Sequence, residues 1–194
     1  YMMPAKEVGG DLYDFVLEDD HLYICLGDVS GKGVPAALFM GHATRMFRAL
    51  AKEKHTPKAI ATLLNEEFTE GNDNGMFVTM FIAYIDLKTG RMDFCNAGHN
   101  PPVFDGKFME METNAPIGLW PELEFVCESV ENIKGRMLFI YSDGLNEAEN
   151  SQQEQFGDER MLQILQNSHF DSAKKVIDNM RDAVEKHRNG ASPI

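Results

Sequence analysis

The N-terminal part of the chain alternates between apolar and polar positions in a way that predicts a β-hairpin. Apolar-rich runs occupy residues 12–17 and 22–26, and the polar segment Glu18-Asp19-Asp20-His21 separates them. The second run continues into Gly27 and Asp28, so we expect the second strand to end at this aspartate.

The period of the apolar positions then lengthens to that of helices. Gly33-Val34-Pro35 predicts a helix start, since proline is tolerated in the first turn. A second helix is expected from Thr56-Pro57. The apolar positions expected to face the core are Ala36, Met40, Ala43, Phe47 and Leu50 in the first helix and Ile60, Leu63 and Leu64 in the second.

From residue 77 onward, β-branched and aromatic residues predict a return to strands. Strands are expected at 77–87, 91–95 and 103–104, with turns at Lys88-Thr89-Gly90 and Asp105-Gly106. The apolar run 137–141 predicts a central buried strand that ends near Asp143. Helices are expected at 160–166 and 172–187.

The grouping of these elements predicts a segregated α+β fold, with mostly antiparallel sheets packed against helices. No internal repeat or low-complexity linker divides the sequence, so we expect residues 1–194 to form a single domain. Because the first residue is Tyr1 and not methionine, we expect this domain to be a piece of a longer protein.

The composition narrows the classes of partner. With 43% hydrophobic and 25% charged residues the chain is typical of globular proteins, and a net charge of −13 argues against a nucleic-acid partner. No apolar run approaches the roughly 20 residues of a membrane span. The cysteines are odd in number and widely spaced, and Cys25 and Cys95 lie in apolar runs. We therefore expect buried free thiols, no zinc site and a reducing, cytoplasmic compartment.

Three aspartates at the ends of apolar runs are the candidate chemical groups. Asp11, Asp28 and Asp143 each adjoin a glycine-containing turn. Carboxylates placed at strand ends can converge on a divalent cation, and the peptide carbonyl of Val29 can face the same ion as Asp28. Each aspartate alone is better explained as part of a turn, but their combination favours Mn²⁺ or Mg²⁺, which prefer oxygen ligands.

The segment 27–33 joins a strand to a helix and therefore invites comparison with a phosphate-binding loop. The spacing does not fit, because three residues and not four separate Gly27 from Gly31-Lys32, and a glycine follows the lysine. Glycines that simply permit a helix start remain an alternative to the metal-binding interpretation.

Five motifs, in this order, resemble those of the RsbU/SpoIIE-type bacterial serine/threonine phosphatases, within the metal-dependent protein phosphatase (PPM, type 2C-like) family. They are Pro4-Ala5-Lys6-Glu7-Val8-Gly9-Gly10-Asp11-Leu12-Tyr13-Asp14, Gly27-Asp28-Val29-Ser30-Gly31-Lys32-Gly33-Val34-Pro35-Ala36-Ala37, Gly75-Met76-Phe77-Val78-Thr79, Asn96-Ala97-Gly98-His99-Asn100-Pro101-Pro102 and Tyr141-Ser142-Asp143-Gly144, and Phe156-Gly157 also recurs.

This resemblance implies two antiparallel β-sheets sandwiched between α-helices, and two Mn²⁺ or Mg²⁺ ions. Asp28 would bridge the ions, the Val29 carbonyl would bind one of them, Asp143 would ligate the other, and Asp11 would complete the cluster directly or through water. A water activated by the two metals would then hydrolyse phosphoserine or phosphothreonine on a protein, without a protein nucleophile.

The resemblance also implies a regulatory setting for this catalytic domain. The expected substrate is a phosphorylated anti-sigma-factor antagonist, and a sensory or regulatory domain is expected upstream. The family's last metal aspartate belongs to an Asp-Asp pair beyond a helix like 172–187, and this chain has no such pair after that helix. We therefore expect the fold to be truncated at both ends, and a catalytically incomplete, phosphatase-like binding domain is the alternative function.

Several residues near these motifs have two interpretations. His99 is either a general acid or metal ligand or, as favoured here, a residue that stabilises its loop; Asn96 and Asn100 are equally open. Ser30 and Lys32 follow Asp28 closely and either approach the phosphate or serve only the local structure.

Overall fold

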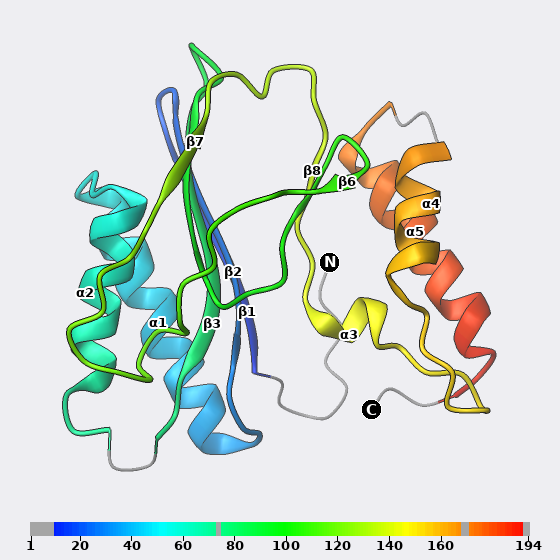
Figure 1. The fold of residues 1–194 in the computed structure, drawn as a ribbon, viewed down its shortest axis with the longest axis horizontal. Coiled ribbons are helices and arrows are strands. Elements are labelled where there is room, and N and C mark those ends of the chain that lie inside the picture. The colour runs from blue at the N-terminus through cyan, green and yellow to red at the C-terminus, as the bar shows by residue number, and fades with distance from the viewer. Residues whose placement is uncertain (1–9, 73–74, 168–170, 192–194) are drawn as a thin grey trace. The chain divides into compact units, whose positions relative to one another are not determined.

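The computed structural model describes residues 10–72, 75–167 and 171–191, and the chain divides into two compact units (Figure 1). The first unit comprises Val8–Pro101 and Glu110–Gly135, and the second includes Pro102–Met109 and the chain from Arg136 onward. The organisation of residues 1–194 as a single domain stays a prediction.

An antiparallel five-stranded sheet, in the order β1-β2-β3-β4-β7, forms the centre of the first unit. The strands are β1 (Asp11–Glu18), β2 (His21–Val29), β3 (Val78–Asp86), β4 (Met92–Ala97) and β7 (Glu128–Val130). The predicted hairpin is confirmed, because β1 pairs with β2 along its whole length and the second strand runs through Asp28. The strand β7 was not predicted from the sequence.

Two helices, α1 (Val34–Lys52) and α2 (Pro57–Thr69), cover one face of this sheet (Figure 1). The helix α1 begins at Val34, one residue before the predicted Pro35, and α2 begins at the predicted Pro57. The Thr56 hydroxyl caps α2 by accepting a hydrogen bond from the Ala59 amide at 3.2 Å. The predicted apolar stripe of α1 is buried at Ala36, Ala43, Phe47 and Leu50, with Met40 packed partly against the same core.

The strand β1, which ends the order of the described strands in its sheet, has one buried face and one face with exposed apolar side chains. Leu12 and Val16 point into the core beneath the helices, whereas Tyr13, Phe15 and Leu17 are exposed. The alternation follows from the period of two in a strand.

The described part of the second unit contains a small antiparallel sheet in the order β6-β5-β8, together with three helices. Its elements are β5 (Val103–Phe104), β6 (Lys107–Phe108), β8 (Leu138–Phe139), α3 (Asp143–Asn146), α4 (Asp158–Asn167) and α5 (Ala173–Arg188). The helices α4 and α5 pack around Met161, Leu165, Val176 and Met180. The predicted helices 160–166 and 172–187 are thereby confirmed, while α3 was missed.

The predicted strand at 137–141 is confirmed only in part. Only Leu138 and Phe139 form a strand, and β8 lies at the end of the order of described strands in its sheet. Phe139 and Tyr141 are buried, whereas Leu138 and Ile140 are half-buried, so the predicted burial is confirmed on one face of this segment.

Two antiparallel sheets with accompanying helices confirm the predicted α+β class. Within the described ranges, no helix is both long and apolar enough to cross a membrane.

Candidate functional site

The hairpin β1–β2 brings two of the predicted metal ligands together. Asp11 begins β1, Asp28 is the penultimate residue of β2, and the two residues are directly opposite each other in the strand register. Directly opposed residues project to the same face of a sheet, and like charges there destabilise the pair. A cation between the two carboxylates would remove this repulsion.

Gly10 leaves a gap that two oxygen atoms line. A Cβ atom at this position would lie 2.8 Å from the Val29 carbonyl oxygen and 3.0 Å from Asp28 Oδ1. The strands are locked here, because the Val29 amide donates to the Gly10 carbonyl at 3.2 Å. One carbonyl and one carboxylate oxygen around a gap are the hard donors that Mg²⁺ and Mn²⁺ prefer, so these residues fit such an ion.

The loop after β2 is fixed by Ser30 and Phe77. The Ser30 amide donates to the Phe77 carbonyl, and the Phe77 amide donates to Ser30 Oγ, each at 2.8 Å. This exchange gives Ser30 a structural role. Gly33, which precedes α1, has φ 82°, a left-handed conformation that favours glycine. Lys32 is exposed.

His99 is buried and held by its own loop and by β3. Asn96 bonds both the amide and the carbonyl of His99, and His99 Nδ1 lies 3.1 Å from Thr79 Oγ1. These contacts show that Asn96 stabilises the loop through the main chain of His99, while the role of the His99 imidazole stays a prediction.

Thr79 is a residue of the site region that the sequence reasoning did not single out. It is opposite Asp28 in the β2–β3 register, and its hydroxyl lies 3.4 Å from the Asp28 carbonyl oxygen. Thr79 therefore links His99 to the strand that carries Asp28. Its place at the end of the Gly75–Thr79 motif was the available signal, since that motif had no assigned task.

Asp143 belongs to the second unit. It begins the four-residue helix α3, and its side chain is exposed. Within residues 10–72, 75–167 and 171–191, no three His, Cys, Asp or Glu side chains gather closely enough to hold a metal ion. The metal-ligand and catalytic roles of Asp11, Asp28, Val29 and Asp143 thus stay predictions.

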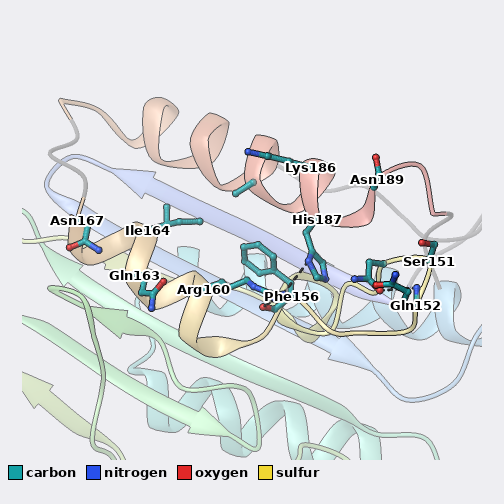
Figure 2. Close-up of a pocket in the computed structure, with 12 residues that line it drawn as sticks. Ser151, Gln152, Phe156, Arg160, Gln163, Ile164, Asn167, Lys186, His187 and Asn189 are labelled. Carbon is teal, nitrogen blue, oxygen red and sulfur yellow. Dashed lines mark hydrogen bonds between the residues drawn. The ribbon is translucent and has the colours of Figure 1, made fainter.

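A hollow of about 800 Å³ lies between α4, α5 and the segment before α4 in the second unit (Figure 2). The His187 ring lines this hollow; its Nε2 donates to the Glu154 carbonyl at 2.8 Å, and its Nδ1 accepts from Arg160 at 3.1 Å. The ring also meets Phe156 edge-on. None of the predicted site residues lines this hollow. Both ring nitrogens of His187 already bond to neighbouring groups.

The architecture is that of the PP2C-type phosphatase domains. The SiaA-PP2C domain of Pseudomonas aeruginosa matches 98% of this chain and 78% of its own with a TM-score of 0.84, at 18% sequence identity. RsbX, solved in complex with magnesium, matches 94% of this chain and 84% of its own with a TM-score of 0.72, at 14% identity. At these identities, the matches show a shared fold.

The sequence defines the group more closely. The profile of the SpoIIE family (Stage II sporulation protein E) matches residues 18–193, and the chain belongs to this family. It is 29% identical over 190 residues to the phosphoserine phosphatase RsbU of Bacillus subtilis (strain 168), a match that covers 95% of this chain. The match spans 56% of RsbU, so the chain corresponds to little more than half of that relative.

Proposed function

We propose that this chain is the catalytic domain of a metal-dependent protein phosphatase that hydrolyses phosphoserine or phosphothreonine on a protein. The observation that carries the proposal is the opposed pair Asp11 and Asp28, beside the Val29 carbonyl at the end of the hairpin. Membership in the SpoIIE family and similarity to a phosphoserine phosphatase support this reading of the pair.

The ligands proposed for two Mn²⁺ or Mg²⁺ ions are Asp28, shared between them, the Val29 carbonyl, Asp11 and Asp143. The magnesium complex of RsbX, a protein of the same fold, supports dependence on divalent ions. When bound, two such ions lower the pKa of a water molecule and neutralise phosphoryl oxygens.

The chain's own residues would keep the ligands in place. The Val29 carbonyl belongs to the same peptide group as the Ser30 amide, which donates to the Phe77 carbonyl at 2.8 Å, and the main chain at Asp28 is supported by Thr79. Burial raises the pKa of the Cys25 thiol, and Ser30 Oγ accepts a hydrogen bond from Phe77, so neither side chain is prepared as a nucleophile. The attacking group would be water.

A phosphorylated anti-sigma-factor antagonist is the proposed substrate, and a regulatory or sensory domain upstream is the proposed partner. Both follow from the resemblance to RsbU/SpoIIE-type phosphatases, as does the proposed site of action in the cytoplasm. The net charge of −13 is consistent with a protein partner and not with nucleic acid.

The test is Mn²⁺-dependent release of phosphate from a phosphoserine protein, with Asp28→Asn as the variant. Loss of a shared ligand removes several kcal/mol of transition-state stabilisation, so we expect about a 100-fold or larger loss of rate. Asp19→Asn is the matched control, because it removes the same charge from an exposed turn of the same hairpin.

Equal activity in Asp28→Asn and the unaltered chain would refute the proposed site. If the chain binds the phosphorylated protein but releases no phosphate with Mn²⁺ or Mg²⁺, the alternative of a phosphatase-like binding domain replaces the proposal.

A further inference from the structure

Two of the three cysteines are opposite each other at one edge of the first unit. In the register of β4 and β7, Phe94 faces Glu128, and the next positions along the two chains are Cys95 and Cys127. Opposed residues of antiparallel strands have Cα atoms about 4.5–5.5 Å apart. That spacing falls within the roughly 4.4–6.8 Å that a disulfide requires, so a bond needs no large backbone movement.

Asn114 holds the segment before β7 against β4. Its Nδ2 donates to the Asn96 carbonyl at 3.0 Å and to the Val126 carbonyl at 2.9 Å, while its Oδ1 accepts from the Val126 amide at 2.7 Å. Cys95 Sγ lies 3.8 Å from the same Val126 carbonyl oxygen. Cys127 is therefore kept beside Cys95 although it lies just outside the strand.

The two thiols differ in exposure and acidity. Cys95 is buried and Cys127 is half-buried. A hydrogen bond from the Cys95 thiol, together with the positive charge of Lys58, lowers the pKa of Cys127. The same hydrogen bond, together with burial, raises the pKa of Cys95. Cys127 is thus the thiol better prepared to react as a thiolate.

We propose that Cys95 and Cys127 are a reactive thiol pair that a hydroperoxide converts into an intramolecular disulfide. The Cys127 thiolate attacks the terminal peroxide oxygen, the O–O bond breaks, and an alcohol or water leaves with a proton from solvent. Cys95 then attacks the sulfenic sulfur of Cys127, the S–O bond breaks, and water leaves. The peroxide gains the two electrons that the two thiols lose.

The second step is assisted by the first. Once Cys127 is a neutral sulfenic acid, its thiolate no longer raises the pKa of Cys95, and the two sulfur atoms stay adjacent. The third cysteine offers an internal comparison, because Cys25 is buried on β2 and burial raises the pKa of its thiol. This inference does not depend on phosphatase activity.

The test is peptide mapping of the folded chain after reduction, removal of the reductant, and exposure to hydrogen peroxide. Trypsin cleaves after lysine and arginine, so it places Cys95 in the peptide 92–107 and Cys127 in the peptide 108–134. We expect these two peptides to become linked, with a loss of two hydrogen atoms, while Cys25 stays alkylatable after unfolding. The linked peptide should disappear on treatment with a thiol reductant.

Two variants decide the result. Cys127→Ser should abolish the linked peptide, and Cys25→Ala should leave its yield unchanged. The proposal is overturned if the folded, unaltered chain gives no 92–107/108–134 linkage at peroxide concentrations that consume Cys127. It is also overturned if the linkage forms only between two copies of the chain, which mixing with isotope-labelled protein detects.

Discussion

The Asn96 side chain forms hydrogen bonds with both the main-chain amide and the main-chain carbonyl of His99. Asn96 Oδ1 accepts from the His99 amide at 2.9 Å, and Asn96 Nδ2 donates to the His99 carbonyl at 2.9 Å. Both residues are buried, so water does not readily substitute for the amide group of Asn96. One side chain thus closes the loop that follows β4.

Replacing Asn96 should therefore destabilise the first unit. In Asn96→Ala the buried amide and carbonyl of His99 lose their partner, and we expect the free energy of unfolding to fall by about 1–3 kcal/mol in urea titrations. Asn100→Ala is the control within the same loop, where the residue is only half-buried. Equal losses in the two variants would contradict the role given to Asn96.

Gly10→Ala should disturb the candidate metal site directly. The added methyl group would lie 2.8 Å from the Val29 carbonyl and 3.0 Å from Asp28 Oδ1, so the strands or the carboxylate must move. We expect a loss of about 1–3 kcal/mol of stability and weaker Mn²⁺ binding, measured by calorimetry. Gly41→Ala is the matched control: nothing lies within 4 Å of its Cβ position in α1, and this change should stabilise the chain by about 0.5–1 kcal/mol.

Asp105 should make a pH-dependent contribution to the second unit. Its carboxylate accepts from Arg136 Nε at 2.6 Å and from the Met137 amide at 3.0 Å, and these bonds lower its pKa. A lowered folded-state pKa stabilises the fold above the unfolded value of about 4, and this stabilisation is lost as the pH falls below it.

Asp105→Asn should accordingly be less stable than the unaltered chain at pH 7, with a difference that shrinks toward pH 3. Because the Asp105 and Arg136 side chains are 42% and 44% exposed, we expect a difference below about 1 kcal/mol. Asp19→Asn is the control, since Asp19 and Asp105 have φ 52° and 48° in comparable turns. A stability difference that does not vary with pH would rule out the charge effect.

Lys58→Gln should slow the alkylation of Cys127. The positive charge of Lys58 lowers the pKa of this thiol, so its removal raises the pKa and reduces the thiolate fraction at a given pH. We expect the rate with iodoacetamide near pH 7 to fall about two- to fivefold, and the midpoint of the pH–rate profile to move upward. Lys88→Gln, which changes a lysine that pairs with Asp20, should leave the rate unaltered.

The periodicity of the sequence was sufficient to predict the helices and the long strands. The apolar stripe through Phe47 marks α1, because one face of the helix must be buried against the sheet, and Pro57 marks the first turn of α2. Among the short elements, β5 was predicted, but β7 and α3 were not. The three residues of β7 and the four of α3 contain too few positions to show a period, and the burial of 137–141 depends on neighbours distant in the sequence.

The residues of the candidate site likewise differ in how far the sequence could predict their placement. Asp11 and Asp28 could be brought together from the sequence because a hairpin sets its own register. The tasks of Thr79 and Asn96 could not, since they depend on contacts between different strands and loops. Asp143 was selected by its motif, and its metal-ligand role stays a prediction.

The interleaving of the two units limits how this protein can be divided for expression. The second unit takes Pro102–Met109 from the middle of the chain, and Glu110–Gly135 then returns to the first unit. A fragment that ends within residues 110–135 lacks β8, and one that ends before Glu128 also lacks β7. During synthesis, β5 and β6 leave the ribosome before their partner β8. The small sheet therefore cannot form until residues 110–135, which belong to the first unit, have also been made.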